Sequence, residues 1–391
     1  MLAGRWNVLV LLFAVRATMG FQYQSVASVA PLIARDMGVT LADIGLLFGL
    51  YLAPGMALAY PGGSIGRRFG DRPVVLAGLA LMVLGGAIMA FVPSWAGQVV
   101  GRLVAGVGAV LINVLMSKMV TDWFAGREIA TAMAAFVNSW PVGIAAALMV
   151  LPPIAEMQGL KAAYLFSALL VLLGLVLLAQ RYTPPSRSGQ FEVLATVMPE
   201  RAALKAVIVA GSIYGLYNGG LAMVFAFGPT LLVERGWPIT SAGSTVSLLL
   251  WFAIVSVPLG GVLADRLKFH CMFVIAGCLA SGILVILASR QPHQVFLYAV
   301  LGLVAGFPAG PIMSLPSRVL GPSSRAIGMG AFFSVFYAAM LVGPAVGGWL
   351  AARNGSAAAA LDFGALMLFA CVPGVWLYRR LTVPRQHALA A

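Results

Sequence analysis

Residues 102–118 read RLVAGVGAVLINVLMSK, and residues 302–318 read GLVAGFPAGPIMSLPSR. The two stretches lie 200 residues apart and agree at 8 of 17 positions: 103, 104, 105, 106, 109, 112, 115 and 117. Each is an apolar run that ends in one basic residue. A repeat at about half of the chain length predicts that one structural unit occurs twice.

Two further pairs of segments repeat at nearly the same offset. GSIGRRFGDR at 63–72 corresponds to GVLADRLKFH at 261–270, and PVGI at 141–144 is echoed by PAVGG at 344–348. Apolar helices share chance identities, so one match alone would mean little. Three matches at nearly one offset support a duplicated unit.

The composition defines what that unit is. Hydrophobic residues make up 61% of the 391 residues and charged residues only 9%, which excludes a soluble globular protein. A spanning helix needs about 20 apolar residues, and the apolar runs do not alternate as barrel strands would. We therefore predict an all-α membrane protein of two pseudo-symmetric six-helix bundles, with spans near 6–34, 42–66, 73–92, 97–122, 129–152, 160–181, 205–233, 240–265, 270–289, 293–317, 326–351 and 357–378.

The longest polar stretch divides these spans six and six. It predicts bundles at 1–182 and 205–391 joined by a cytoplasmic linker at 183–204. Placing both termini in the cytoplasm puts sixteen basic residues on the inner side and five on the outer side, as the positive-inside rule requires. The net charge of +13 is thus explained by orientation in a cell inner membrane, and no nucleic acid is implied as a partner.

Several motifs resemble those of the major facilitator superfamily. Its loop motif G-x-x-x-D-R-x-G-R-R is matched by Gly261, Asp265 and Arg266, and its R-x-x-x-G-x-G pattern begins at Arg102. The first-half copy of the loop has Arg67 in place of the acid and Asp71 in place of a base. The resemblance implies the fold of that family, transport by alternating access between two halves, and a monomer.

Arg16 is the candidate substrate anchor. It lies about 10 residues, hence about 15 Å, into the first span, where a guanidinium facing lipid is costly. No acidic residue lies deep within any span, and Asp362 comes closest. Two structural alternatives stay open, namely a carboxylate on a neighbouring helix and the capping of carbonyls at a helix break near Gly20. We favour an anion supplied by the substrate.

Other polar or aromatic residues are expected to line the same cavity. Each is more often a helix-packing residue than a ligand contact, but together they would form a mainly uncharged pocket. The set comprises Tyr23, Gln24, Asn113, Asn138, Ser139, Trp140, Tyr214, Asn218, Trp251, Ser334 and Tyr337.

A second group of residues is assigned to gating or coupling. Arg102 would either snorkel to the interface or act in a gate, and Lys118 would join a gate or contact the anion at the inner mouth. Inner-face charges of mixed sign would latch the outward-open state. These are Arg67, Arg68, Asp71, Arg72, Asp122, Asp265, Arg266 and Arg318.

These observations predict a secondary transporter of a small anion, with one negative charge because one deep arginine is present. No P-loop, catalytic set, cofactor motif or metal-ligand spacing is visible, so neither an enzyme nor an ATP-driven pump is expected. A proton or counter-anion is the expected coupling partner. A proton-driven efflux pump for hydrophobic drugs is the alternative, and a sensor that has lost transport is a rival of another class.

Overall fold

The computed structural model describes residues 4–59, 61–124, 128–185, 198–321 and 324–388. All regular structure in these ranges is helical. Ten segments are long and apolar enough to cross a bilayer, and one of them, Thr131–Arg181, has the length of two crossings. It turns at Gly159, whose φ of 82° is not helical. With the 24-residue helix α1 (Arg5–Ser28), twelve crossings result, and the predicted all-α membrane fold is confirmed.

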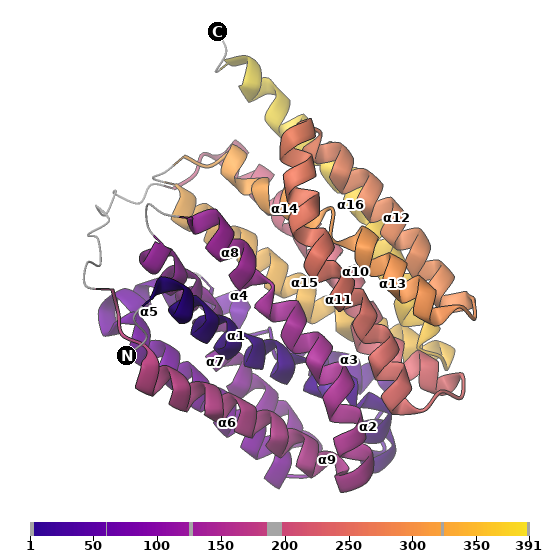
Figure 1. Ribbon diagram of the computed structural model, residues 1–391. Helices are drawn as coiled ribbons and strands as arrows, with labels where there is room; N and C mark the ends of the chain where they lie inside the picture. The colour runs from indigo at the N-terminus through magenta and orange to yellow at the C-terminus, as the bar shows by residue number, and fades with distance from the viewer. Residues whose placement is uncertain (1–3, 60, 125–127, 186–197, 322–323, 389–391) are drawn as a thin grey trace.

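In the described residues, the first six crossings are built from nine helices (Figure 1). After α1, they are α2 (Ala30–Met37), α3 (Leu41–Leu50), α4 (Gly55–Leu58), α5 (Gly62–Phe69), α6 (Asp71–Phe91), α7 (Trp95–Phe124), α8 (Ile129–Val137) and α9 (Ser139–Arg181). Helix α1 packs along α9, and α6 packs against both α7 and α9.

Within the part of the chain that the structure describes, the second six crossings use seven helices and one 3₁₀ turn. They are α10 (Arg201–Glu234), α11 (Ile239–Leu267), α12 (His270–Arg290), α13 (Gln294–Ala305), α14 (Ala309–Ser314), η1 (Pro316–Arg318), α15 (Arg325–Asn354) and α16 (Ala358–Ala388). Here α10 is central and packs against α15 and α16.

Four predicted continuous spans are interrupted among the described residues. Those expected at 6–34 and 129–152 divide at Val29 and Asn138, and the other two divide at prolines. The span expected at 42–66 is divided into α3, α4 and α5, and Pro54 and Pro61 precede the second and third of these. The span expected at 293–317 is divided in the same way before Ala309 and at Pro316. Proline lacks the amide hydrogen that a helix interior requires, so each helix ends or restarts there.

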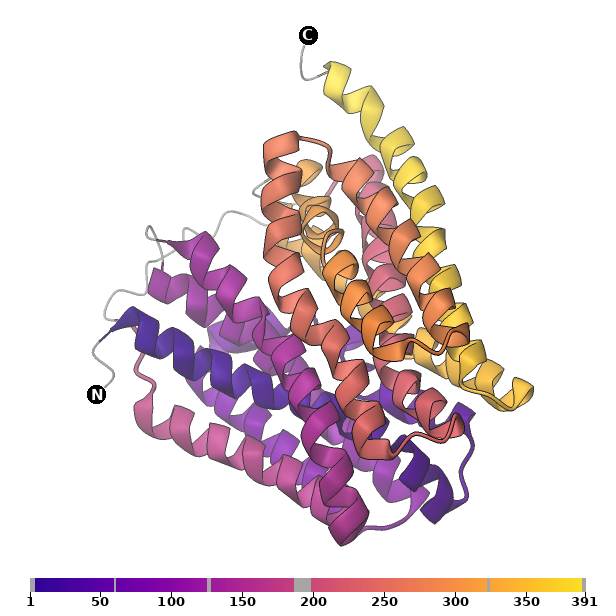
Figure 2. The same cartoon turned by 45° about the vertical axis from the view of Figure 1, so that its right-hand side comes forward.

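The two bundles lie closest on one side of the molecule and diverge on the other (Figure 2). We call the side where α1 begins and α16 ends the terminal side, and the opposite side the far side. On the far side α3 packs against α15, and α9 packs against α11. Small residues permit these approaches, since a Cβ added at Gly49 would lie 2.7 Å from the carbonyl oxygen of Leu341. Polar bonds reinforce them, such as the one from Thr240 Oγ1 to Glu156 Oε2 (2.8 Å).

Candidate functional site

Arg16 lies near the middle of α1, and only 9% of it is exposed. Its Nε and Nη2 donate to Oδ1 of Asn113 on α7, at 3.3 and 3.0 Å. Its Nη1 donates to the carbonyl oxygens of Phe136 (3.3 Å) and Val137 (3.1 Å) and to Oγ of Ser139 (3.1 Å). The guanidinium also lies 4.9 Å from the ring centroid of Phe136. Every one of these partners is uncharged.

The carbonyls that Arg16 binds belong to a break in the fifth crossing. Helix α8 ends at Val137 and α9 begins at Ser139, so the last carbonyls of α8 lack helical partners and carry partial negative charge. Gly20 brings α1 close to this break, because a Cβ there would lie 3.4 Å from Cα of Gly143. Arg16 therefore does cap backbone carbonyls at a helix break, as one structural alternative expected. The break lies in the fifth crossing, however, and not at Gly20 in the first crossing.

Asn113 also connects the two bundles. Its Nδ2 donates to the hydroxyl of Tyr337 on α15 at 3.3 Å, while its Oδ1 receives the Arg16 guanidinium. Tyr337 is 2% exposed. The predicted residues Arg16, Asn113 and Tyr337 thus form one hydrogen-bonded chain that starts in the first bundle and ends in the second. Ser139, also predicted, joins it through Arg16.

Aromatic rings surround this chain on the side of the second bundle. Tyr214 on α10 lies against Phe332 and Phe336 of α15, with ring centroids 5.3 and 4.8 Å apart. Asn218 donates to the carbonyl of Tyr214 within its own helix (2.8 Å), and no hydrogen bond joins it to Arg16. The phenylalanines escaped prediction because apolar residues at helical spacing carry no signal of a cavity.

A second aromatic cluster surrounds Tyr23 in the first bundle. The ring centroid of Tyr23 lies 4.4 Å from that of Phe48, 5.0 Å from Trp140 and 5.6 Å from Tyr51. Tyr23 is fully buried, and its hydroxyl has no hydrogen-bond partner among the described residues. The predicted residues Tyr23 and Trp140 therefore contact each other. Tyr23 lies about two helical turns along α1 from Arg16, toward the far side.

Two predicted amides bridge the bundles instead of lining a shared pocket with Arg16. Gln24 donates through Nε2 to the carbonyl of Phe225 on α10 (2.7 Å), and Asn138 donates through Nδ2 to the carbonyl of Ile254 on α11 (3.3 Å). Trp251 is 40% exposed and takes part in none of the ring pairs found in the described chain. Ser334 donates to the carbonyl of Met56, again across the bundles (3.3 Å).

Arg102 does not snorkel to the interface, since it is fully buried. It donates to four backbone carbonyls: Gln22 (3.0 Å) and Tyr23 (2.9 Å) on α1, and Leu47 (3.1 Å) and Phe48 (3.3 Å) on α3. Its guanidinium also lies 4.7 Å from the ring centroid of Tyr51. A single side chain thereby fastens α7 to two neighbouring helices.

The charges predicted on the inner face pair within their own bundle. Lys118 forms an ion pair with Asp71 and another with Asp122 (3.4 Å). Arg72 donates to the carbonyl of Ala179 at 2.5 Å. All of these contacts lie in the first bundle. The Lys118–Asp71 pair ties α7 to the start of α6, the Arg72 bond ties the start of α6 to α9, and the Lys118–Asp122 pair lies within α7.

The second-bundle charges are more exposed. Asp265 pairs with His270 (2.9 Å), and its side chain is 80% exposed. Arg266, Arg318 and Arg68 are exposed as well, and the side chain of Arg67 lies outside the described residues. Among the residues described, no ion pair links the two bundles on the terminal side. This agrees with the divergence of the bundles there (Figure 2).

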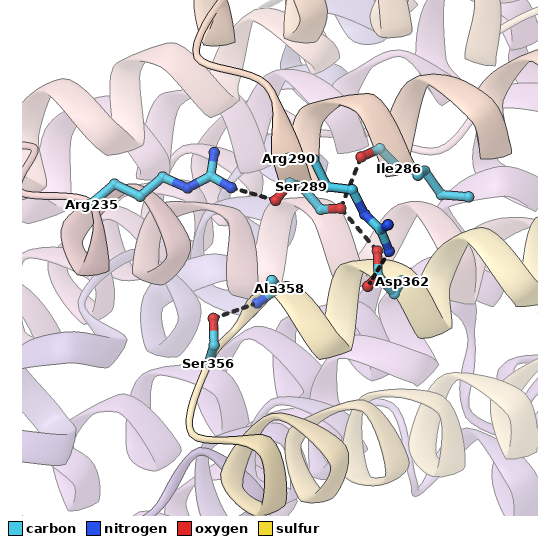
Figure 3. Close-up of polar contacts among 7 residues, drawn as sticks. All are labelled: Arg235, Ile286, Ser289, Arg290, Ser356, Ala358 and Asp362. Carbon is cyan, nitrogen blue, oxygen red and sulfur yellow. Dashed lines mark hydrogen bonds and ion pairs between the residues drawn. The ribbon is translucent and has the colours of Figure 1, made fainter.

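The acidic residue nearest to a span, Asp362, lies in the first turns of α16 (Figure 3). It accepts hydrogen bonds from Ser289 Oγ (2.8 Å) and Arg290 Nη2 (3.2 Å), while Arg235 donates to the carbonyl of Ser289. No carboxylate of the described residues pairs with Arg16 or Arg102. The described chain also contains no group of three or more His, Cys, Asp or Glu residues placed to hold a metal ion.

Comparison with known proteins agrees with this architecture. The sequence profile of the Major Facilitator Superfamily matches residues 12–338 and 211–391. The inner membrane transport protein YajR of Escherichia coli K12 is 25% identical over 326 residues, covering 80% of this chain and 70% of that protein. The multidrug resistance protein MdtL of Shigella flexneri is 25% identical over 362 residues, covering 87% and 86%.

Solved structures show the same fold. A bacterial homolog of the human lysosomal transporter Spinster, in an inward-facing and occupied conformation, superposes with a TM-score of 0.75 at 14% identity, covering 98% of this chain and 97% of the other. Its inward-facing and unoccupied form gives a TM-score of 0.72, with 96% of each chain covered.

Proposed function

Because the chain belongs to the Major Facilitator Superfamily and is a membrane transporter, we propose that its cargo is a small anion with one negative charge, moved by alternating access. The observation that carries this proposal is the environment of Arg16. The residue is 9% exposed, yet the contacts of its guanidinium are an amide oxygen, two backbone carbonyls and a hydroxyl. A full positive charge is therefore present without a counter-charge from the described chain.

Such a charge is costly in a bilayer, and the cost falls when an anion arrives. Guanidinium carries five N–H donors, of which Nη2 contributes two, and Nη2 has one partner, Asn113. One N–H therefore stays available to an incoming oxygen. A carboxylate or another monoanion at this position would gain a charge-assisted hydrogen bond, about twice as strong as a neutral one.

The surroundings favour one negative charge and a small body. Arg16 is the one cation among the residues of the described chain that contact Asn113, Ser139 or Tyr337. A dianion would need a second cation, whereas monocarboxylates and cyanate-like anions need one. No carboxylate in the described part of the chain contacts Arg16. We therefore propose anion exchange, uniport or entry of the protonated substrate, and rank these above a proton relay on the protein.

The distribution of basic residues supports an orientation with both termini in the cytoplasm. In that orientation the terminal side faces the cytoplasm, the far side faces outward, and Arg16 lies between them. The far-side contacts described above then form a closed outer gate. A monomer, with no cofactor, accounts for every element of the site.

A second candidate is export of hydrophobic compounds. The similarity to MdtL over 86% of that protein's length supports it, and so do the rings of Tyr214, Phe332 and Phe336 beside Tyr337. Aromatic faces bind organic cations and flat apolar molecules. A buried arginine opposes cationic cargo, which ranks this function below anion transport.

A thermal-shift screen tests the proposal directly. Purified protein is heated in the presence of monocarboxylates, cyanate, inorganic phosphate or lipophilic cations, beside the variants Arg16→Ala and Arg5→Ala. Arg5 lies on the same helix but pairs with Glu128 at the surface, and so serves as the matched control. A monoanion should raise the Tm of the wild type and of Arg5→Ala, and it should leave the Tm of Arg16→Ala unchanged. Stabilisation that persists in Arg16→Ala would refute the site.

Counterflow in proteoliposomes separates transport from sensing. Vesicles preloaded with the stabilising anion should accumulate the same anion in labelled form, and Arg16→Ala should not. Binding without accumulation would indicate a sensor with a transporter fold. Accumulation of a lipophilic cation, and of no anion, would favour the export function.

A further inference from the structure

An apolar groove of about 390 Å³ opens on the surface where α3 of the first bundle meets α15 of the second. One wall is formed by Leu46 and Leu50, and the other by Leu341, Val342, Val346 and Trp349. No lining side chain carries a hydrogen-bonding group except the indole of Trp349. A groove of this composition suits a hydrocarbon chain and offers nothing to a polar ligand.

The groove is a product of close helix packing. A Cβ at Gly49 would lie 2.7 Å from the carbonyl oxygen of Leu341, and a Cβ at Gly45 would lie 3.1 Å from Cα of Gly348. Where backbones approach this closely, the large residues beside the contact project outward from it. Leu46, Val342 and Trp349 are 39%, 55% and 50% exposed and form the groove's rims.

The far-side end of the groove carries a cation. The guanidinium of Arg353, one helical turn beyond Trp349, lies 5.4 Å from the centroid of that ring. Arg353 is exposed and forms no ion pair with any residue in the described part of the chain. The acidic residue at the start of α3, Asp43, forms part of the N-cap of that helix and does not pair with Arg353. It accepts hydrogen bonds from the amide (2.9 Å) and the hydroxyl (2.7 Å) of Thr40.

We propose that this groove binds one anionic phospholipid of the far-side leaflet, with an acyl chain between α3 and α15 and the phosphate at Arg353. Tryptophan settles at the level of lipid headgroups, which places Arg353 at the depth of the phosphates. Guanidinium also matches phosphate through paired donors. The apolar groove and the cation at its far-side end thus match in kind the acyl chain and the phosphate of a single lipid.

The same geometry gives the lipid a conformational effect. The walls of the groove belong to different bundles, so opening of the far side would separate them and destroy the groove. A lipid that binds here therefore stabilises the far-side-closed state. This conclusion does not depend on what the transporter carries.

Quenching of Trp349 by brominated lipid tests the site on the full chain in vesicles. The probes are phosphatidylglycerol and phosphatidylcholine with brominated acyl chains, each diluted into unbrominated phosphatidylcholine. The Trp349 signal is the part of the quenching that Trp349→Phe abolishes, since the chain has eight tryptophans. Half-maximal quenching of that signal should need about fivefold less phosphatidylglycerol than phosphatidylcholine.

The variant Arg353→Gln should remove that fivefold preference, because it weakens the binding of phosphatidylglycerol, which has a net negative charge, more than the binding of zwitterionic phosphatidylcholine. Arg35→Gln is the matched control, because Arg35 is exposed on the far side but paired with Asp36. Both arginines are exposed, so both variants should fold. Equal quenching by the two lipids in the wild type, or a preference that survives in Arg353→Gln, would overturn the proposal. Displacement by inorganic phosphate would show an anion site in place of a lipid site.

Discussion

Asn113 on α7 donates a hydrogen bond of 3.3 Å to the hydroxyl of Tyr337 on α15, and so joins the two bundles at the depth of Arg16. The same amide receives the guanidinium of Arg16 on its oxygen. Its two ends therefore have different tasks. The side-chain oxygen of Asn113 orients Arg16, the candidate anchor. The side-chain nitrogen can bond to Tyr337 only when the second bundle is close.

These tasks can be separated by two substitutions. Asn113→Leu removes the two bonds from Arg16 and the one bond to Tyr337. It should weaken binding of the stabilising anion about tenfold or more, since charged hydrogen bonds contribute about 1.5–3 kcal/mol each. Tyr337→Phe removes only the bond between bundles and should change affinity less than threefold, within about 0.6 kcal/mol. Calorimetric titration measures both. Equal losses in the two variants would mean that the oxygen of Asn113 has no separate role.

Arg102 is expected to matter for stability, through geometry as well as charge. Arg102 donates hydrogen bonds to four carbonyls on α1 and α3. A lysine at this position has one compact ammonium, which cannot bond to both helices at once. Arg102→Lys and Arg102→Met should both lose about 2–4 kcal/mol, seen as a lower Tm in detergent. Arg68→Met, at an exposed site, is the control. An unchanged Tm in Arg102→Lys would show that only the charge matters, as a coupling role requires.

The sequence was sufficient for the architecture because the membrane imposes a simple rule. Long apolar runs must form helices there, and twelve of them were countable. The interruptions at Pro54 and Pro316 were harder to locate. Proline in a membrane helix bends it in some contexts and ends it in others, depending on neighbours that restore the lost hydrogen bond.

The members of the hydrogen-bonded group around Arg16 were predicted in part, and their role in binding stays a prediction. Arg16 was recognisable because a charge at mid-membrane is rare, and Asn113 and Tyr337 were among the polar residues expected around it. Their mutual contacts depend on how the bundles face each other, which local patterns do not encode. The carbonyl partners of Arg16 could not be predicted from the sequence, because every residue has a carbonyl. Only the helix break before Ser139 leaves these carbonyls available to accept a hydrogen bond.

Charges on the terminal side should contribute little to stability, and only where they are paired and partly buried. Asp71→Asn removes a partner of Lys118, whose side chain is 46% exposed, and should cost at most about 1 kcal/mol. The loss should shrink in high salt, because screening weakens exposed pairs. Asp265→Asn, at an 80% exposed site, should leave the Tm unchanged. Tm at low and high salt checks both variants, and a larger loss in Asp265→Asn would contradict this ranking.

Transport rates of the same two variants test the predicted inner-face latch. The latch would form between the bundles only when the terminal side closes, so its loss should favour the state seen here. If Asp265→Asn transports at the wild-type rate with an unchanged conformational balance, Asp265 has no part in the latch. The ion pairs of the described residues lie within single bundles, which is the arrangement expected with the latch open.

The far-side contact between α3 and α15 should be sensitive to added volume at Gly45. A Cβ there would lie 3.0 Å from the carbonyl carbon of Pro344, so Gly45→Val must push the bundles apart on the far side. Spin labels at Asp36 and Asn354, both exposed on that side, should report a longer distance than in the wild type. Gly261→Val is the matched control, because nothing lies within 4 Å of a Cβ at Gly261. If both variants kept the wild-type distance, close packing at Gly45 would not hold the far side shut. A longer distance only in Gly45→Val would show that backbone contact between bundles sets the closed state, since the substitution adds no charge and removes no hydrogen bond.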